Sequence, residues 1–171
     1  MKQFPLLFLL LIVSVSGTRA QGQPTSAPAL LSVDAKGIDA LRAKHKGKVL
    51  VMNFWATWCT PCVQEFPDLV KLQKSYATKG LDVVFVSIDD DDAKTKQRVT
   101  SFLRKQKALP PSYIKSGGDD EQFINAVSSE WSGAIPATFI YNKEGTLVKT
   151  KAEELNYESL KALVEKTIRD K

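Results

Sequence analysis

Cysteine and histidine, the usual ligands of zinc, are scarce in this chain. Its 171 residues contain only two cysteines, Cys59 and Cys62, and one histidine, His45. A closed tetrahedral zinc site takes about four cysteine or histidine ligands, so one chain cannot assemble it. The sequence also lacks a glycine-rich phosphate loop, a heptad run and an internal repeat. The most informative feature that remains is the cysteine pair itself, within Trp58-Cys59-Thr60-Pro61-Cys62.

Two cysteines at this spacing suit a redox-active dithiol, half of a metal site or a small structural bridge. The shortage of other ligands disfavours the metal site. A structural bridge that closes so short a loop would constrain the unfolded chain little, because the stabilisation grows with loop length. A reversible dithiol/disulfide is therefore the favoured interpretation.

The residues around the pair predict a strand followed by a helix. The run from Val49 to Ala56 is apolar and rich in β-branched residues, which is typical of a strand buried on both faces. The cysteines then open a helix, and Pro61 suits its first turn because no N–H is needed there. Free N–H groups and the helix dipole favour a thiolate at Cys59. We therefore expect Cys59 to be the attacking sulfur and Cys62 the resolving one.

At these residues the chain resembles a known superfamily. The segment 54–62, Phe-Trp-Ala-Thr-Trp-Cys-Thr-Pro-Cys, is similar to the thioredoxin active-site segment, and the segment 133–140 resembles the cis-proline loop and its following strand. Glu65, Phe66 and Pro67 are usual in the TlpA/ResA-like branch of exported thiol-disulfide oxidoreductases. The resemblance implies an α/β, thioredoxin-like fold, in which helices flank a central mixed β-sheet and an insertion precedes the cis-proline strand.

The resemblance also suggests a proton acceptor. Thioredoxins carry a buried aspartate where this chain has Asn53, and an amide cannot take a proton. Glu65 lies one helical turn beyond Cys62, so we expect it to accept the proton of that thiol or to modulate its pKa. The plain alternative is an exposed helix glutamate.

Three further residues are expected to bind substrate. In the resemblance, a cis bond between Ile135 and Pro136 places the Ile135 backbone beside Cys59, where an extended substrate peptide can pair. On sequence alone a trans bond would be expected, since most X-Pro bonds are trans. Trp58 adjoins Cys59, and we expect it to offer an apolar rim to a docking polypeptide. Trp55 is expected to be a buried filler.

The chain begins with the features of an export signal. Lys2 precedes a hydrophobic run from Phe4 to Val15, and the small residues near Arg19 suit cleavage after Ala20. The run is about a dozen residues long, short of the roughly 20 that span a bilayer, so an uncleaved anchor is the less favoured alternative. No cysteine stands directly after this run to carry a lipid anchor. Cleavage would leave 22 basic and 19 acidic residues, a net charge of +3 that gives no argument for nucleic-acid binding.

The rest of the chain predicts one domain. Residues 1–20 are the expected signal peptide, 21–29 a flexible polar linker, and 30–171 the thioredoxin-like domain. Export implies a compartment in which disulfides persist, and the resemblance makes it a bacterial periplasm. Further strands are expected at 30–33, 81–88, after 109, and in a hairpin of 138–141 and 146–150, with helices at 37–46, 93–107, 119–131 and 157–169.

Four consecutive aspartates, Asp89 to Asp92, follow the strand expected at 81–88. They raise a calcium hypothesis, but nothing there resembles the spaced ligand loop of a calcium site. Acids just ahead of a helix can instead cap it and complement its dipole. We therefore expect this run to cap the helix that begins near residue 93.

The expected function is that of an exported protein-disulfide reductase that works through a mixed disulfide. The resemblance implies a disulfide-bonded protein substrate, a membrane-embedded or exported electron donor, and no cofactor or metal. Some TlpA/ResA-like relatives serve cytochrome c maturation. The reductive direction also rests on the resemblance, because dithiol enzymes span roughly −270 to −120 mV and Thr60-Pro61 does not place this pair on that scale.

Two alternatives belong to other functional classes. A peroxiredoxin-like peroxide reductase would share the thioredoxin core, but the Pro-x-x-x-Thr-x-x-Cys pattern is missing upstream of Cys59. A copper-binding or partner-binding module would use the two thiolates as ligands for copper(I). The copper-chaperone variant of the fold spaces its cysteines by three residues and adds a distal histidine, and this chain shows neither feature.

Overall fold

A six-stranded sheet forms the centre of the structure, a computed structural model that describes residues 29–170. The expected signal peptide and nearly all of the expected linker lie outside these residues. The strand order is β1-β4-β3-β2-β5-β6. The strands are β1 (Leu30–Val33), β2 (Val49–Trp55), β3 (Leu81–Ser87), β4 (Ser112–Lys115), β5 (Ala137–Tyr141) and β6 (Leu147–Lys151).

The sheet is mixed, as the sequence predicts. Strands β1, β4, β3 and β2 run parallel, whereas β5 is antiparallel to β2 and to β6. Trp55 pairs with Ser87 on β3, and Phe54 pairs with Ala137 on β5. The ends of β2 and β3 and the start of β5 therefore meet at one edge of the sheet, which we call the carboxyl edge.

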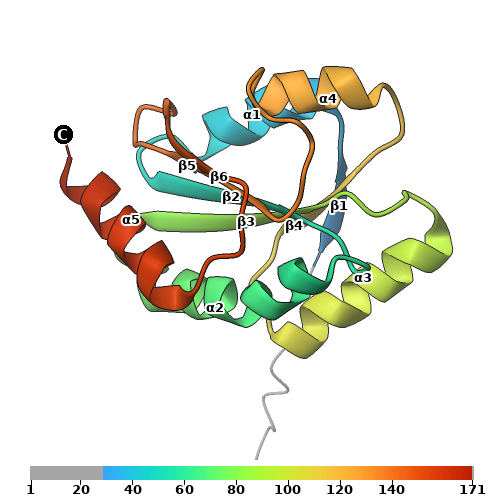
Figure 1. Cartoon of the computed structure of the whole chain (residues 1–171), viewed down its shortest axis with the longest axis horizontal. Coiled ribbons are helices and arrows are strands. Elements are labelled where there is room, and N and C mark those ends of the chain that lie inside the picture. The colour runs from blue at the N-terminus through green and yellow to red at the C-terminus, as the bar shows by residue number, and fades with distance from the viewer. Residues whose placement is uncertain (1–28, 171) are drawn as a thin grey trace, which may run out of the picture.

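Within residues 29–170, five helices cover the two faces of the sheet (Figure 1). On one face lie α2 (Thr60–Tyr76), α3 (Ala93–Gln106) and α5 (Tyr157–Arg169), and on the other α1 (Ala35–Lys44) and α4 (Asp120–Val127). Each face carries its own apolar core, with Phe66 and Leu160 in the first and Ile38 and Phe123 in the second. Every residue of β2 is buried between these two layers, as predicted for a strand without a solvent face.

The ends of the predicted and observed helices differ most at α1 and α4, whereas α3 ends one residue before the predicted 107. Helix α1 begins at Ala35 rather than residue 37, because Asp34 caps it by accepting the Gly37 N–H at 2.7 Å. Helix α4 ends at Val127 rather than residue 131. The Trp131 indole N–H donates to the Ala134 carbonyl at 2.9 Å, which folds this segment into the loop before β5.

The segment between β3 and β5 contains α3, β4 and α4, which is the expected insertion before the cis-proline strand. Strand β4 pairs with β3 on one side and with β1 on the other, so the insertion widens the sheet. None of the helices formed by residues 29–170 combines the length and hydrophobicity needed to cross a bilayer.

Candidate active site

The two cysteines lie at the carboxyl edge, where β2 leads into α2. Cys59 is the N-cap of α2, with extended backbone, and its Sγ accepts the N–H of Cys62 at 3.3 Å. Its own N–H donates to the carbonyl of Ala56 at 3.2 Å, closing the turn from Ala56 to Cys59. Pro61 lies in the first helical turn. Cys59 is therefore next to the positive end of the helix dipole, as predicted, where a thiolate is favoured.

The two sulfurs form a disulfide, with an S–S distance of 2.03 Å. Cys62 is completely buried, whereas Cys59 keeps 6% of its surface exposed. An incoming sulfur can therefore reach Cys59 but not Cys62. This difference supports the predicted order, in which Cys59 reacts with the outside partner.

Glu65 lies inside the protein, 2% exposed, so the alternative of an exposed helix glutamate is wrong. The Asn53 side-chain amide donates to Glu65 Oε1 at 2.9 Å, and the Leu155 backbone N–H donates to Oε2 at 3.0 Å. Burial raises the pKa of Glu65 to about 7, although both hydrogen bonds act to lower it, and the negative charge of Glu154 adds to the rise. Glu65 can therefore exchange a proton near neutral pH.

Asn53 connects Glu65 with the strand that follows the cis-proline. Its amide also donates to the hydroxyl of Thr138 on β5 at 3.0 Å. Asn53 and Thr138 are both buried, and the Asn53 carbonyl oxygen has no hydrogen-bond partner. The sequence did not predict Thr138 or Leu155 as partners, because they lie 85 and 90 residues from the groups they contact.

The raised pKa of Glu65 predicts a pH-dependent stability. The folded protein holds the Glu65 proton up to about pH 7, whereas the unfolded chain releases it near 4.5. Folding therefore takes up a proton between these values, and the stability due to this group is present at low pH and lost as the pH rises towards 7. For the oxidised protein, we expect the free energy of unfolding to fall by about 2–3 kcal/mol more between pH 4 and 8 than in Glu65→Gln. Urea unfolding between pH 4 and 8 measures this difference. A free energy of unfolding that changes with pH in the same way in both proteins would contradict the prediction.

The peptide bond between Ile135 and Pro136 is cis. A second cis bond, between Pro110 and Pro111, precedes β4. Pro136 directly precedes β5, so it lies at the carboxyl edge together with the turn that carries Cys59. Ile135 is partly buried and packs against the apolar core that contains both cysteines.

The two tryptophans near the cysteines differ sharply in exposure. Trp55 is 1% exposed and packs against Phe66 and Phe102, with ring centroids 4.7 and 4.8 Å apart, which confirms that it is a core filler. Trp58 is 65% exposed. Among the residues that the structure describes, it is an unusually exposed large hydrophobic side chain, and it directly precedes Cys59.

The four aspartates do not act together. Asp92 caps α3 by accepting the N–H groups of Lys94 and Thr95, as predicted for this run. Asp89 instead points inward and is 3% exposed. It accepts hydrogen bonds from Thr57, two residues before Cys59. Sequence reasoning missed this residue, and the only signal for it was its position soon after a buried strand.

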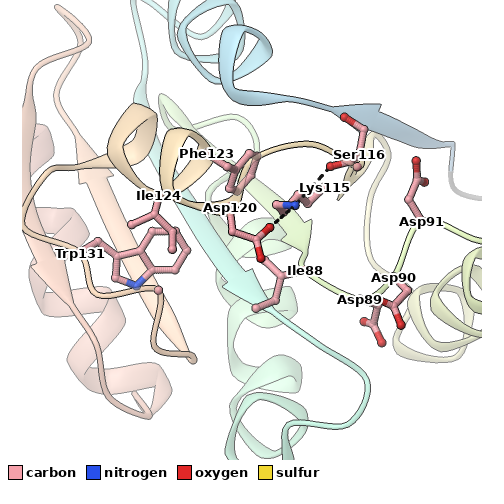
Figure 2. Close-up of a pocket in the computed structure, with 12 residues that line it drawn as sticks. Ile88, Asp89, Asp90, Asp91, Lys115, Ser116, Asp120, Phe123, Ile124 and Trp131 are labelled. Carbon is pink, nitrogen blue, oxygen red and sulfur yellow. Dashed lines mark hydrogen bonds and ion pairs between the residues drawn. The ribbon is translucent and has the colours of Figure 1, made fainter.

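A pocket of about 270 Å³ opens at the carboxyl edge, between the loop after β3 and α4. Lys115 pairs with Asp120 at 2.6 Å, and Figure 2 marks this pair by a dashed line. Ile124 and Trp131 line the same pocket. The pocket also borders Gly133, in the loop that leads to the cis-proline. The expected insertion therefore contributes to the surface beside the cis-proline loop.

Within residues 29–170, no cluster of three or more histidine, cysteine or acidic side chains is arranged to hold a metal ion. His45 lies at the opposite edge of the sheet, where its Nδ1 is 2.7 Å from a carboxylate oxygen of Asp82. Asp82 pairs with Leu50 near the start of β2, far along the strand from the cysteines.

Comparisons with known proteins agree with this site. The family model described as Redoxin matches residues 20–165. The chain is similar to the thiol-disulfide oxidoreductase ResA of Bacillus thuringiensis subsp. konkukian, with 27% identity over 170 residues, covering 94% of this chain and 92% of the relative. ResA of Bacillus subtilis is 28% identical over 78% of this chain and 69% of its own length. A thiol:disulfide interchange protein of Chlorobium tepidum superposes with a TM-score of 0.62 and 25% identity, covering 74% of this chain and 83% of that one.

The fold and the disulfide-forming pair thus define a thiol-disulfide oxidoreductase. The chain belongs to the Redoxin family, as a TlpA/ResA-like member of the thioredoxin superfamily.

Proposed function

We propose that this protein is an exported reductase of protein disulfides, in which Cys59 attacks and Cys62 resolves. The observation that carries the proposal is the arrangement at the start of α2. A partly exposed Cys59 caps the helix, a fully buried Cys62 follows it, and a buried carboxylate with a pKa of about 7 lies one turn further on. Each of these three groups matches one requirement of dithiol exchange.

In the first step, the Cys59 thiolate attacks one sulfur of the substrate disulfide. The substrate S–S bond breaks, a mixed disulfide to Cys59 forms, and the second substrate sulfur leaves as a thiolate. The N–H groups at the start of α2 and the helix dipole stabilise the attacking anion. The Cys62 N–H, which points at Cys59 Sγ, is the donor that the structure shows.

In the second step, Cys62 releases the substrate. The Cys62 thiol gives its proton to Glu65, and the resulting thiolate attacks Cys59 Sγ. The mixed disulfide breaks, the substrate departs as a second thiolate, and the Cys59–Cys62 disulfide forms. The substrate has then gained two electrons and this protein has lost two, so an exported or membrane-embedded dithiol donor must reduce the pair again.

The substrate polypeptide is proposed to lie between the cis-proline loop and Trp58. The Ile135 backbone precedes β5 at the carboxyl edge and suits pairing with an extended peptide. Trp58 supplies an exposed aromatic surface next to the attacking sulfur. Both lie at the edge where the disulfide must be presented.

Trp58→Ala is expected to weaken the binding of protein substrates but not of small disulfides. An exposed aromatic anchor contributes about 1–2 kcal/mol to docking, so KM for a protein disulfide should rise about five- to thirtyfold. The rate with a small disulfide such as oxidised glutathione should change less than about twofold, because it does not need the docking surface. Val148→Ala, at another exposed apolar position on β6, is the matched control. Equal losses with both substrates would contradict a docking role.

Export is supported by the sequence alone, through the hydrophobic run 4–15 and the small residues before residue 21. A periplasmic location would expose the protein to substrates that accumulate disulfides. Among these, the haem-attachment Cys-x-x-Cys-His segment of an apocytochrome c is the proposed specific substrate. A peptide carrying this segment as a disulfide should be reduced faster than a control peptide with the same loop and no histidine.

Insulin reduction tests the general activity. The fully reduced protein, freed of other thiols, should reduce about one insulin disulfide per molecule, because the active-site pair carries two electrons. Peroxide consumption measured on the same preparation distinguishes a protein-disulfide reductase from the peroxiredoxin alternative. Rapid loss of peroxide with no reduction of insulin would overturn the proposed function.

A further inference from the structure

Asp89 differs from the aspartates beside it in its surroundings. Its side chain has no exposed surface, whereas Asp90 is exposed and Asp91 is paired with Lys96 at 2.6 Å. Asp89 follows β3 at the carboxyl edge (Figure 2). A buried carboxylate is costly unless hydrogen bonds compensate it, so its partners indicate its role.

Two of the hydrogen bonds that the Asp89 carboxylate accepts come from Thr57, on the turn that precedes Cys59. The Thr57 backbone N–H donates to one carboxylate oxygen at 2.9 Å, and the Thr57 hydroxyl donates to the other at 2.5 Å. The Ser87 hydroxyl, at the end of β3, donates at 2.7 Å. Asp89 therefore joins the end of β3 to the turn that joins β2 to α2.

Arg98 of α3 completes this network from outside. Its Nε donates to the Thr57 hydroxyl oxygen at 3.0 Å, and its guanidinium lies 3.5 Å from Asp89 Oδ1. Thr57 thus has its N–H, its hydroxyl proton and its hydroxyl oxygen all engaged. A residue held at three points two positions before Cys59 leaves the turn little freedom.

We propose that Asp89 is a positioning residue for the attacking sulfur. Its hydrogen bonds to Thr57 hold the turn so that Cys59 Sγ stays against the N–H groups at the start of α2. The inference deepens the proposed function, since it takes Cys59 to be the attacking group. Asp89 acts through Thr57 and does not itself touch the reacting atoms.

Two substitutions of Asp89 separate its hydrogen bonds from its charge. Asp89→Asn and Asp89→Ala both remove the negative charge. The loss of this charge lowers the pKa of Cys59 by the same amount in both variants. Only Asn keeps an oxygen that can accept the Thr57 N–H. The proposal therefore predicts a higher Cys59 pKa in Asp89→Ala than in Asp89→Asn, because only Ala releases the turn.

The measurement is the alkylation rate of Cys59 by iodoacetamide across pH, in a Cys62→Ser background where Cys59 is the single thiol. At pH 7, Asp89→Ala should react about three- to tenfold more slowly than Asp89→Asn. Asp90→Asn is the matched control, and its Cys59 should be alkylated at the same rate as in the Cys62→Ser parent protein. If Asp89 only stabilised the fold, Asp89→Ala would have a lower unfolding temperature, but Cys59 of the two folded variants would be alkylated with the same pH profile. Folded variants that agree within about twofold would overturn the proposal.

A second pair of variants serves if Asp89→Ala does not fold. Thr57→Val removes the hydroxyl bonds to Asp89 and Arg98 but keeps the carboxylate and the backbone N–H, and Thr57→Ser keeps the hydroxyl. Alkylation of Cys59 at pH 7 should be about threefold slower in Thr57→Val than in Thr57→Ser. Equal rates in this pair would likewise overturn the proposal.

The alkylation experiment is independent of any protein substrate. If the wild-type protein fails to reduce insulin while the two Asp89 variants differ as predicted, the proposed function fails and the positioning role stands. If insulin is reduced and the two variants agree, the positioning role fails alone.

Discussion

Cys62→Ser is expected to stop turnover and to trap substrate on Cys59 as a stable mixed disulfide. Cys59 keeps its place at the start of α2 and its exposed surface, so attack on the substrate proceeds. No second thiolate is then present to break the bond between Cys59 and the substrate sulfur. Insulin reduction should fall at least about a hundredfold, and a covalent complex should appear on a non-reducing gel.

Cys59→Ser is the matched control for this experiment. It should lose the same activity and form no complex, because the remaining Cys62 has no exposed surface. The order of the two sulfurs would be wrong if Cys59→Ser, rather than Cys62→Ser, accumulated the complex. Dithiothreitol should release the trapped substrate and show that the bond is a disulfide.

Glu65→Gln is expected to slow the release of substrate from the mixed disulfide at least about tenfold at pH 8, since a positioned base contributes roughly this much or more. In the wild-type protein the release rate should rise with pH and level off above about 7, as the Glu65 carboxyl loses its proton. Glutamine has no titrating group, so that rise should disappear. Below pH 6 the two proteins should approach each other in rate.

Glu154→Gln provides a directional control for the role of Glu65. The charge of Glu154 helps to raise the Glu65 pKa, so its removal should move the midpoint of the profile to lower pH and keep the maximal rate. Rapid-quench measurement of mixed-disulfide decay resolves both effects. If the release rate of Glu65→Gln still rose with pH at the wild-type midpoint, a group other than Glu65 would take the proton.

Local patterns predicted the strand and helix around the cysteines well. The apolar run from Val49 and the proline after Cys59 define β2 and the start of α2 without help from distant residues. The last helix, Tyr157–Arg169, also has the predicted bounds, because its apolar residues repeat with a clear helical period. The helix expected at 119–131 was too long, since Trp131 forms a loop contact that periodicity does not reveal.

The surroundings of the reactive groups could not be predicted in the same way. The family resemblance pointed to Glu65, but its burial and its raised pKa depend on the Asn53 amide and the Leu155 N–H. Asp89 and Asp92 are equivalent in a run of four aspartates. Only the packing of β3 beside β2 turns Asp89 inward towards Thr57, while Asp92 stays outside as a helix cap.

The reduction potential of the Cys59–Cys62 pair tests the central claim most directly. The purified protein is equilibrated with defined ratios of reduced and oxidised dithiothreitol, and the dithiol fraction is read after alkylation. A reductase of protein disulfides should give about −250 mV or lower, near the thioredoxin end of the range. A value near −120 mV would contradict the account and make the protein a donor of disulfides.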